Sequence, residues 1–208
     1  MKRLLSLIIV LALATGIFAC SADTSDLRGS KKLAVLFPGM GYTTDRPLLS
    51  ESRKLLEKEG YEILCIEWEN PVKTRYDQAS EILDSIYFNE YEDVIFVCKS
   101  IGTEIASTYV AKHDLDVKQI WYTPLMGAFE ACDSDDCGDT IIAFIGTSDG
   151  RSDVSQIREK AARMNIELHL YDGCDHSLEC KDASKNREIL DDIMKITRDY
   201  VIKDIHEA

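Results

Sequence analysis

Strand and helix signals alternate without interruption along most of this 208-residue chain. Short apolar runs predict strands, and apolar residues that recur every three to four positions predict helices. Six strands are expected, at 32–37, 61–67, 93–98, 118–122, 140–146 and 166–171. We expect a helix after each strand, and the weakest helical signal is that of 125–131.

This alternation restricts the fold class. Consecutive parallel strands need a crossover connection, which a helix usually provides. The sequence therefore predicts an α/β fold, a three-layer sandwich with a mostly parallel six-stranded sheet. The length fits one domain with a large core, and 45% apolar and 29% charged residues are typical of a globular protein. The sequence holds no internal repeat and no insertion large enough for a lid domain.

The first residues differ in composition from the rest. Lys2 and Arg3 precede an almost wholly apolar stretch at 4–18, which is shorter than the about 20 residues that a membrane-spanning helix needs. A basic head followed by such a stretch is typical of a secretory signal. The expected divisions are a signal peptide at 1–19, a tether at 20–30 and the α/β domain at 31–208.

The segment Ile17-Phe18-Ala19-Cys20 resembles the lipobox of bacterial lipoproteins, although Phe18 stands where a small residue is usual. In that motif the cysteine is lipidated and becomes the first mature residue, so the resemblance implies lipidation of Cys20. We therefore expect an exported, membrane-anchored lipoprotein of the cell envelope. A secreted or periplasmic protein with an ordinary cleaved signal and an uncleaved anchor are the alternatives.

The chain is acidic, with a formal net charge of −13. Such a charge repels phosphate backbones, so we expect no nucleic-acid partner. The chain has seven cysteines, and an exported protein can form disulfides. The candidate pairs are Cys132 with Cys137 and Cys174 with Cys180, whereas Cys65 and Cys98 lie in predicted strands as buried thiols. We expect no metal site, because no CxxC motif is present.

Ligands of open parallel sheets bind beyond the carboxyl ends of the strands, so the residues that follow each strand are the candidates for chemistry. The segment Cys98-Lys99-Ser100-Ile101-Gly102 follows the third strand. A small residue two before a serine and a glycine two after it match a nucleophile elbow, in which the turn into the helix is too tight for bulky neighbours. The usual first glycine is a cysteine here. The alternative is that the serine only caps the helix.

Two further strand ends supply the groups that a serine nucleophile needs. Asp149 follows the strand at 140–146, and His176 follows the strand at 166–171. A histidine accepts the serine proton, and a carboxylate orients the histidine. The chain order of Ser100, Asp149 and His176 is the order of α/β-hydrolase triads.

Other residues fit these roles less well. His113 lies near a predicted helix end, His169 lies within a strand and His206 lies in the C-terminal tail. Asp153 and Asp175 are the reserve candidates for the acid. His176 and Asp149 also have structural alternatives: His176 as a loop histidine without a function, and Asp149 as a turn-forming aspartate.

The segment Gly39-Met40-Gly41 follows the first strand. A glycine-rich turn points backbone N–H groups into a site, so we expect the N–H groups of Met40 and Ile101 to form an oxyanion hole. The alternative is a phosphate-binding loop. Its third glycine is absent, because Thr44 stands there, and so is the lysine of the Walker motif.

These residues, each after the matching strand, make the chain similar to the α/β-hydrolase superfamily from about 32 to 200. It resembles a minimal, lidless member that lacks the first two of the usual eight strands. The resemblance implies a nucleophile after the third of these strands, an acid after the fifth and a histidine after the sixth. The chain departs from the family pattern at Cys98, at Pro38 before the glycine loop and at Lys99.

The expected function is that of a serine hydrolase that acts on a small ester or related acyl substrate through an acyl-enzyme, without a cofactor. A catalytically silent binding lipoprotein with the same fold is the main alternative. A phosphate-binding protein that uses Gly39 and Gly41, and a thiol-redox role for Cys174, are weaker alternatives. Lys99 is expected to be exposed at the turn, and contact with an anionic substrate is its alternative role.

Overall fold

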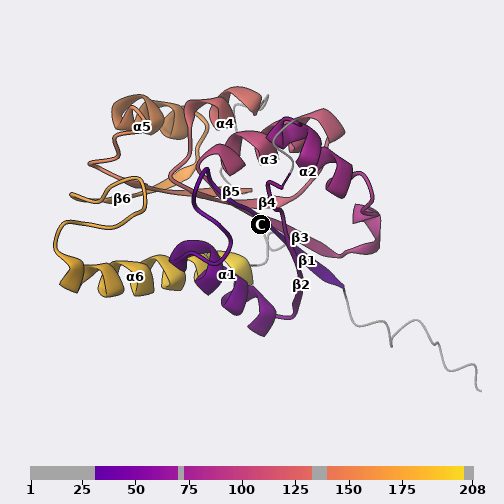
Figure 1. Cartoon of the computed structure of the whole chain (residues 1–208), viewed down its shortest axis with the longest axis horizontal. Helices are drawn as coiled ribbons and strands as arrows, with labels where there is room; N and C mark the ends of the chain where they lie inside the picture. The colour runs from indigo at the N-terminus through magenta and orange to yellow at the C-terminus, as the bar shows by residue number, and fades with distance from the viewer. Residues whose placement is uncertain (1–30, 70–72, 133–139, 204–208) are drawn as a thin grey trace, which may run out of the picture.

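The computed structural model describes residues 31–69, 73–132 and 140–203, and its centre is one sheet in the order β2-β1-β3-β4-β5-β6 (Figure 1). The strands are β1 (Lys32–Phe37), β2 (Tyr61–Cys65), β3 (Asp93–Lys99), β4 (Lys118–Tyr122), β5 (Ile141–Gly146) and β6 (Glu167–Tyr171). All neighbouring strands pair in parallel. The α/β prediction is confirmed, and the sheet is wholly rather than mostly parallel.

Helices cover both faces of the sheet. They are α1 (Pro47–Lys58), α2 (Arg75–Leu83), α3 (Ile101–His113), α4 (Met126–Ala131), α5 (Val154–Arg163) and α6 (Ala183–Ile202), with a 3₁₀ helix at Phe88–Glu90. Figure 1 shows α1 and α6 on one face and α2 to α5 on the other. Each face holds its own apolar core cluster, so the three-layer sandwich is confirmed.

The central strands are apolar along their whole length because both of their faces are covered. All six residues of β5 are buried, and so are the last six of β3. The predicted strand at 61–67 ends earlier, at Cys65. Strand β3 runs one residue further than predicted, to Lys99, so that Ser100 alone separates it from α3.

The strand order makes the end of β1 the expected place for a ligand site. From β1 the chain crosses to β2 on one side, and β3 then pairs with the other side of β1. The helices that follow, α1 after β1 and α3 after β3, lie on opposite faces (Figure 1). Loops that diverge in this way leave a ligand site between them.

The expected signal peptide, tether and lipidation site, at 1–19, 20–30 and Cys20, lie outside the described residues. Within the part of the chain that the structure describes, no helix is both long and apolar enough to cross a bilayer.

Candidate active site

Ser100 lies at the turn between β3 and α3 in a conformation that few residues other than glycine adopt, with φ 54° and ψ −121°. Such a backbone costs about 1–3 kcal/mol and persists only where its surroundings hold it. Its N–H donates to the carbonyl of Tyr122 at 3.0 Å, and the Thr103 hydroxyl donates to its carbonyl at 2.6 Å. The Ser100 side chain makes no capping hydrogen bond to α3, so the capping alternative is not realised.

Small neighbours make this turn possible. A Cβ added to Gly102 would lie 2.6 Å from the carbonyl oxygen of Phe37, so the start of α3 packs directly on the end of β1. Cys98 is fully buried in the core cluster on the α3 side of the sheet, and burial raises the pKa of its thiol. A cysteine therefore fits where the usual elbow has glycine.

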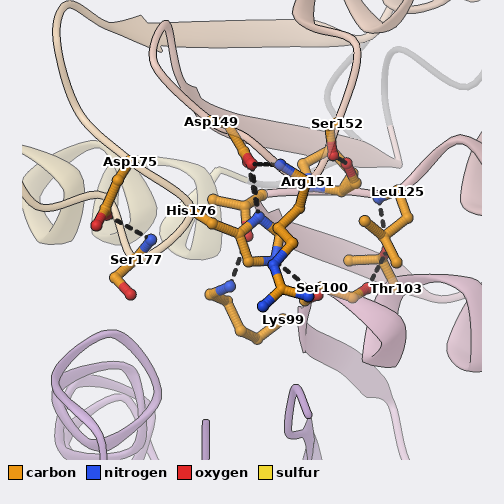
Figure 2. A network of polar contacts seen from close by, with 12 residues as sticks. Lys99, Ser100, Thr103, Leu125, Asp149, Arg151, Ser152, Asp175, His176 and Ser177 are labelled. Carbon is orange, nitrogen blue, oxygen red and sulfur yellow. Dashed lines mark hydrogen bonds and ion pairs between the residues drawn. The ribbon is translucent and has the colours of Figure 1, made fainter. Parts of the chain in front are cut away.

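His176 and Asp149 complete a hydrogen-bonded chain with Ser100 (Figure 2). The distance from His176 Nε2 to Ser100 Oγ is 2.7 Å, and the distances from His176 Nδ1 to Asp149 Oδ2 and Oδ1 are 2.7 and 2.9 Å. Since a carboxylate only accepts, Nδ1 carries the proton and Nε2 accepts from the serine hydroxyl. The structure thus brings together the three residues predicted from the sequence.

The Asp149 carboxylate is fully enclosed, whereas the His176 ring keeps 23% of its surface exposed. Burial alone would raise the pKa of Asp149. The hydrogen bonds from His176 and the Arg151 N–H, with the nearby charges of His176 and Lys99, outweigh it and lower this pKa. Asp149 is therefore ionised and oriented before a substrate arrives.

The loop that carries His176 is fixed against the end of β5. The Ser148 N–H donates to the Cys174 carbonyl at 2.9 Å. Within the loop, the Asp175 carboxylate accepts from the N–H groups of Ser177 at 2.7 Å and Glu179 at 3.2 Å (Figure 2 shows the first). These bonds hold the loop in the position that brings the imidazole within hydrogen-bond distance of Ser100.

The reserve candidates have other roles. Asp153 caps α5 through two backbone N–H groups, and Asp175 closes its own loop. His113 stacks on a tyrosine of its own helix, and His169 stacks on a phenylalanine of β5. His206 lies outside the described residues.

Lys99 is not where we expected it. Only 1% of it is exposed, so the prediction of an exposed lysine at the turn is wrong. As the last residue of β3 it extends beneath the site, where its Nζ donates to the Thr123 hydroxyl at 2.6 Å and lies 5.0 Å from the centre of the Tyr42 ring. Burial lowers the pKa of its amine to about 7, against the opposing charges of Asp149 and Asp175.

The glycine loop after β1 forms a tight turn. The N–H groups of Gly39 and Tyr42 donate to each other's carbonyls, and Met40 at the tip is 68% exposed. Gly39 lies so close to Ser100 that an added Cβ would be 3.3 Å from the Ser100 Cβ. Among the described residues, the N–H groups of Met40 and Ile101 have no hydrogen-bond partner. Their oxyanion role stays a prediction.

Sequence reasoning missed Arg151. It follows Asp149 by two residues, in a loop singled out for its position after a strand, yet nothing in the pattern shows where its long side chain lies. In Figure 2 the side chain extends from this loop in the direction of Ser100.

The cysteine predictions stay open. Cys174 and Cys180 are thiols that face each other across an isolated antiparallel bridge, with their side chains in hydrogen-bond contact. Cys132 follows α4, and Cys137 lies outside the described residues. Among the side chains that the structure describes, no group of three or more His, Cys, Asp and Glu is arranged to hold a metal ion.

Neither a family model nor a curated protein matches the chain. Solved structures do match it. Est1E from Butyrivibrio proteoclasticus aligns with a TM-score of 0.63 at 10% identity, over 84% of this chain and 90% of that one. A serine hydrolase without a lid from Xanthomonas campestris gives 0.64 at 11%, over 85% and 84%, and dienelactone hydrolase from Anabaena variabilis gives 0.62 at 14%, over 84% and 87%. These likenesses show that the chain has the α/β-hydrolase fold.

Proposed function

We propose that the protein is a serine hydrolase that cleaves an ester or related acyl substrate through an acyl-enzyme intermediate. The observation that carries the proposal is the continuous hydrogen-bond chain from Ser100 through His176 to the enclosed Asp149. A strained serine whose hydroxyl contacts a histidine, rather than its own helix, supports catalysis over a silent binding role.

In the first step, Ser100 Oγ attacks the acyl carbon while His176 Nε2 accepts its proton. The Asp149 carboxylate stabilises the imidazolium through Nδ1. The N–H groups of Met40 and Ile101 hold the oxyanion of the tetrahedral intermediate, and the positive end of α3 favours the same charge. His176 then returns the proton to the leaving group, and the Ser100 ester forms.

Water enters in the second step. His176 accepts a proton from it as it attacks the acyl-enzyme, and the same two N–H groups hold the second oxyanion. The acid leaves and Ser100 regains its proton. No step requires a cofactor, and the His176 side chain, which is 23% exposed, can be reached by water.

The test uses the full-length protein purified in detergent, treated with a neutral fluorophosphonate probe and with 4-nitrophenyl acetate. We expect the wild type to be labelled once and to hydrolyse the ester. Ser100→Ala should abolish labelling and lower kcat by about 10⁴-fold or more, as removal of a triad nucleophile does. Ser155→Ala, which removes an exposed hydroxyl on α5, serves as the control. An unlabelled wild type, or labelling of Ser100→Ala, would count against the proposal.

A further inference from the structure

Arg151 is held in a fixed relation to the triad. Its backbone N–H donates to Asp149 Oδ1 at 2.8 Å, so its position depends on the same carboxylate that orients His176. In the view of Figure 2 its side chain extends from the loop after β5 in the direction of Ser100. Lys99 gives a second indication of this position: burial lowers the pKa of its amine most, and the charge of Arg151 lowers it further. The guanidinium therefore lies within electrostatic range of the residue next to the nucleophile.

Arg151 is exposed, and its guanidinium has no ion pair or hydrogen bond with any residue that the structure describes. Three carboxylates of the loops after β5 and β6 are engaged elsewhere. Asp149 accepts from His176, Asp153 caps α5, and Asp175 accepts from its own loop. In a chain with 37 acidic and 24 basic residues, the cation beside the nucleophile is thus left without an anion.

An unneutralised guanidinium at this place would work against the reaction. His176 becomes positive when it accepts the serine proton, and a second positive charge close to it disfavours that state. An anion brought by the substrate would remove this penalty. A planar guanidinium is also well suited to bind a carboxylate through two parallel hydrogen bonds.

We infer that Arg151 determines the substrate class of the site by binding a carboxylate carried by the ester beside its scissile bond. The inference rests on the proposed serine hydrolase function and goes beyond it. A different role for Arg151, in stabilising the oxyanion, would accelerate neutral and anionic esters alike. The two roles therefore predict different ratios of kcat/KM for anionic over neutral esters.

The experiment compares two matched pairs of esters. One carries the carboxylate on the leaving group, 4-acetoxybenzoate against its methyl ester. The other carries it on the acyl group, mono-4-nitrophenyl adipate against its methyl ester. The variants are Arg151→Met and, as a control with the same change in net charge, Arg158→Met on the exposed face of α5. Titration with the neutral fluorophosphonate gives the active-site concentration for each protein.

We expect the ratio of kcat/KM for the anionic over the neutral ester to fall about tenfold in Arg151→Met for at least one pair, as loss of one charge-assisted contact predicts. The fall should come mainly from KM, should shrink at high salt and should be absent in Arg158→Met. An unchanged ratio in both pairs, or an equal loss on neutral and anionic esters, would overturn the inference. If Ser100 is labelled and the ratio is unchanged, the inference about Arg151 fails while the proposed hydrolase function stands. If the wild type is not labelled, the proposed function fails as well.

Discussion

Lys99 carries an ionisable amine that is buried next to Ser100. Its ammonium donates to one hydroxyl, that of Thr123, and faces the Tyr42 ring. Thr123 itself has a φ of 47°, which is unfavourable for a β-branched residue. Burial of a charge with so few hydrogen bonds costs free energy, and burial accordingly lowers the pKa of Lys99 to about 7.

We predict that Lys99→Met stabilises the fold, most strongly at low pH. The pKa of Lys99 is about 7 when folded and 10.5 otherwise, so the unfolded chain binds more protons between these values and stability rises with pH. At about 1.4 kcal/mol per pKa unit, the penalty is several kcal/mol below pH 7 and vanishes above pH 10. Urea unfolding of both proteins at pH 6, 8 and 10 measures the difference. A difference that does not change with pH would contradict the prediction.

At the residue scale, the sequence predicts which residues lie at the site but not where their long side chains point. Ser100, Asp149 and His176 were found because each follows a predicted strand, and parallel strands bring their carboxyl ends together. The sequence does not show the direction of a long side chain. The sequence therefore predicts neither the burial of Lys99 nor the direction of Arg151, although both residues lie at or just after strand ends.

At the scale of elements, the site depends on two close contacts at strand ends, one made by the start of α3 and one made by the loop that carries His176. Gly102 brings α3 onto the end of β1, and Gly146, the last residue of β5, contacts the loop that carries His176. A Cβ added to Gly146 would lie 2.1 Å from the Cys174 carbonyl oxygen. The atoms that an added Cβ would meet belong to the backbone of the loop, so no flexible side chain could move aside. This contact therefore sets the position of the His176 loop.

We predict that Gly146→Ala lowers the rate of Ser100 labelling by the fluorophosphonate by about 10²-fold, because a shift of about 1 Å in a catalytic group has that effect. Gly150→Ala is the matched control, since an added Cβ there meets nothing within 4 Å. Circular dichroism would show whether both variants keep their secondary structure. Folded Gly146→Ala that is labelled as fast as Gly150→Ala would contradict the prediction.

The elements themselves were largely predictable because each one repeats its signal over several residues. Buried strands such as β3 and β5 are continuous apolar runs, and α6 has an apolar stripe at helical spacing. Boundaries were less predictable. Strand β2 ends at Cys65, the last residue paired in register with β1, although Ile66 is still buried and its N–H donates to the Leu36 carbonyl at 2.9 Å.

At the scale of the whole molecule, the parallel sheet separates the site from the start of its first strand. All strands run in one direction, so Ser100, Asp149 and His176 lie at the carboxyl edge of the sheet. Strand β1 begins at Lys32, at the opposite edge. An anchor in the residues before β1 would therefore join the domain at the edge opposite the site.

We propose that a lipid on Cys20 provides this anchor, and we predict that it fixes location without changing catalysis. In a bacterial host that exports lipoproteins, the full-length wild type should incorporate an alkyne fatty acid and fractionate with membranes. Cys20→Ala should lose both properties, whereas Cys65→Ala, a thiol within β2, should keep them. Because the site lies at the far edge of the sheet, all three proteins should react with the water-soluble fluorophosphonate at equal rates. Fatty-acid label that persists in Cys20→Ala, or a wild type without label, would contradict the proposal.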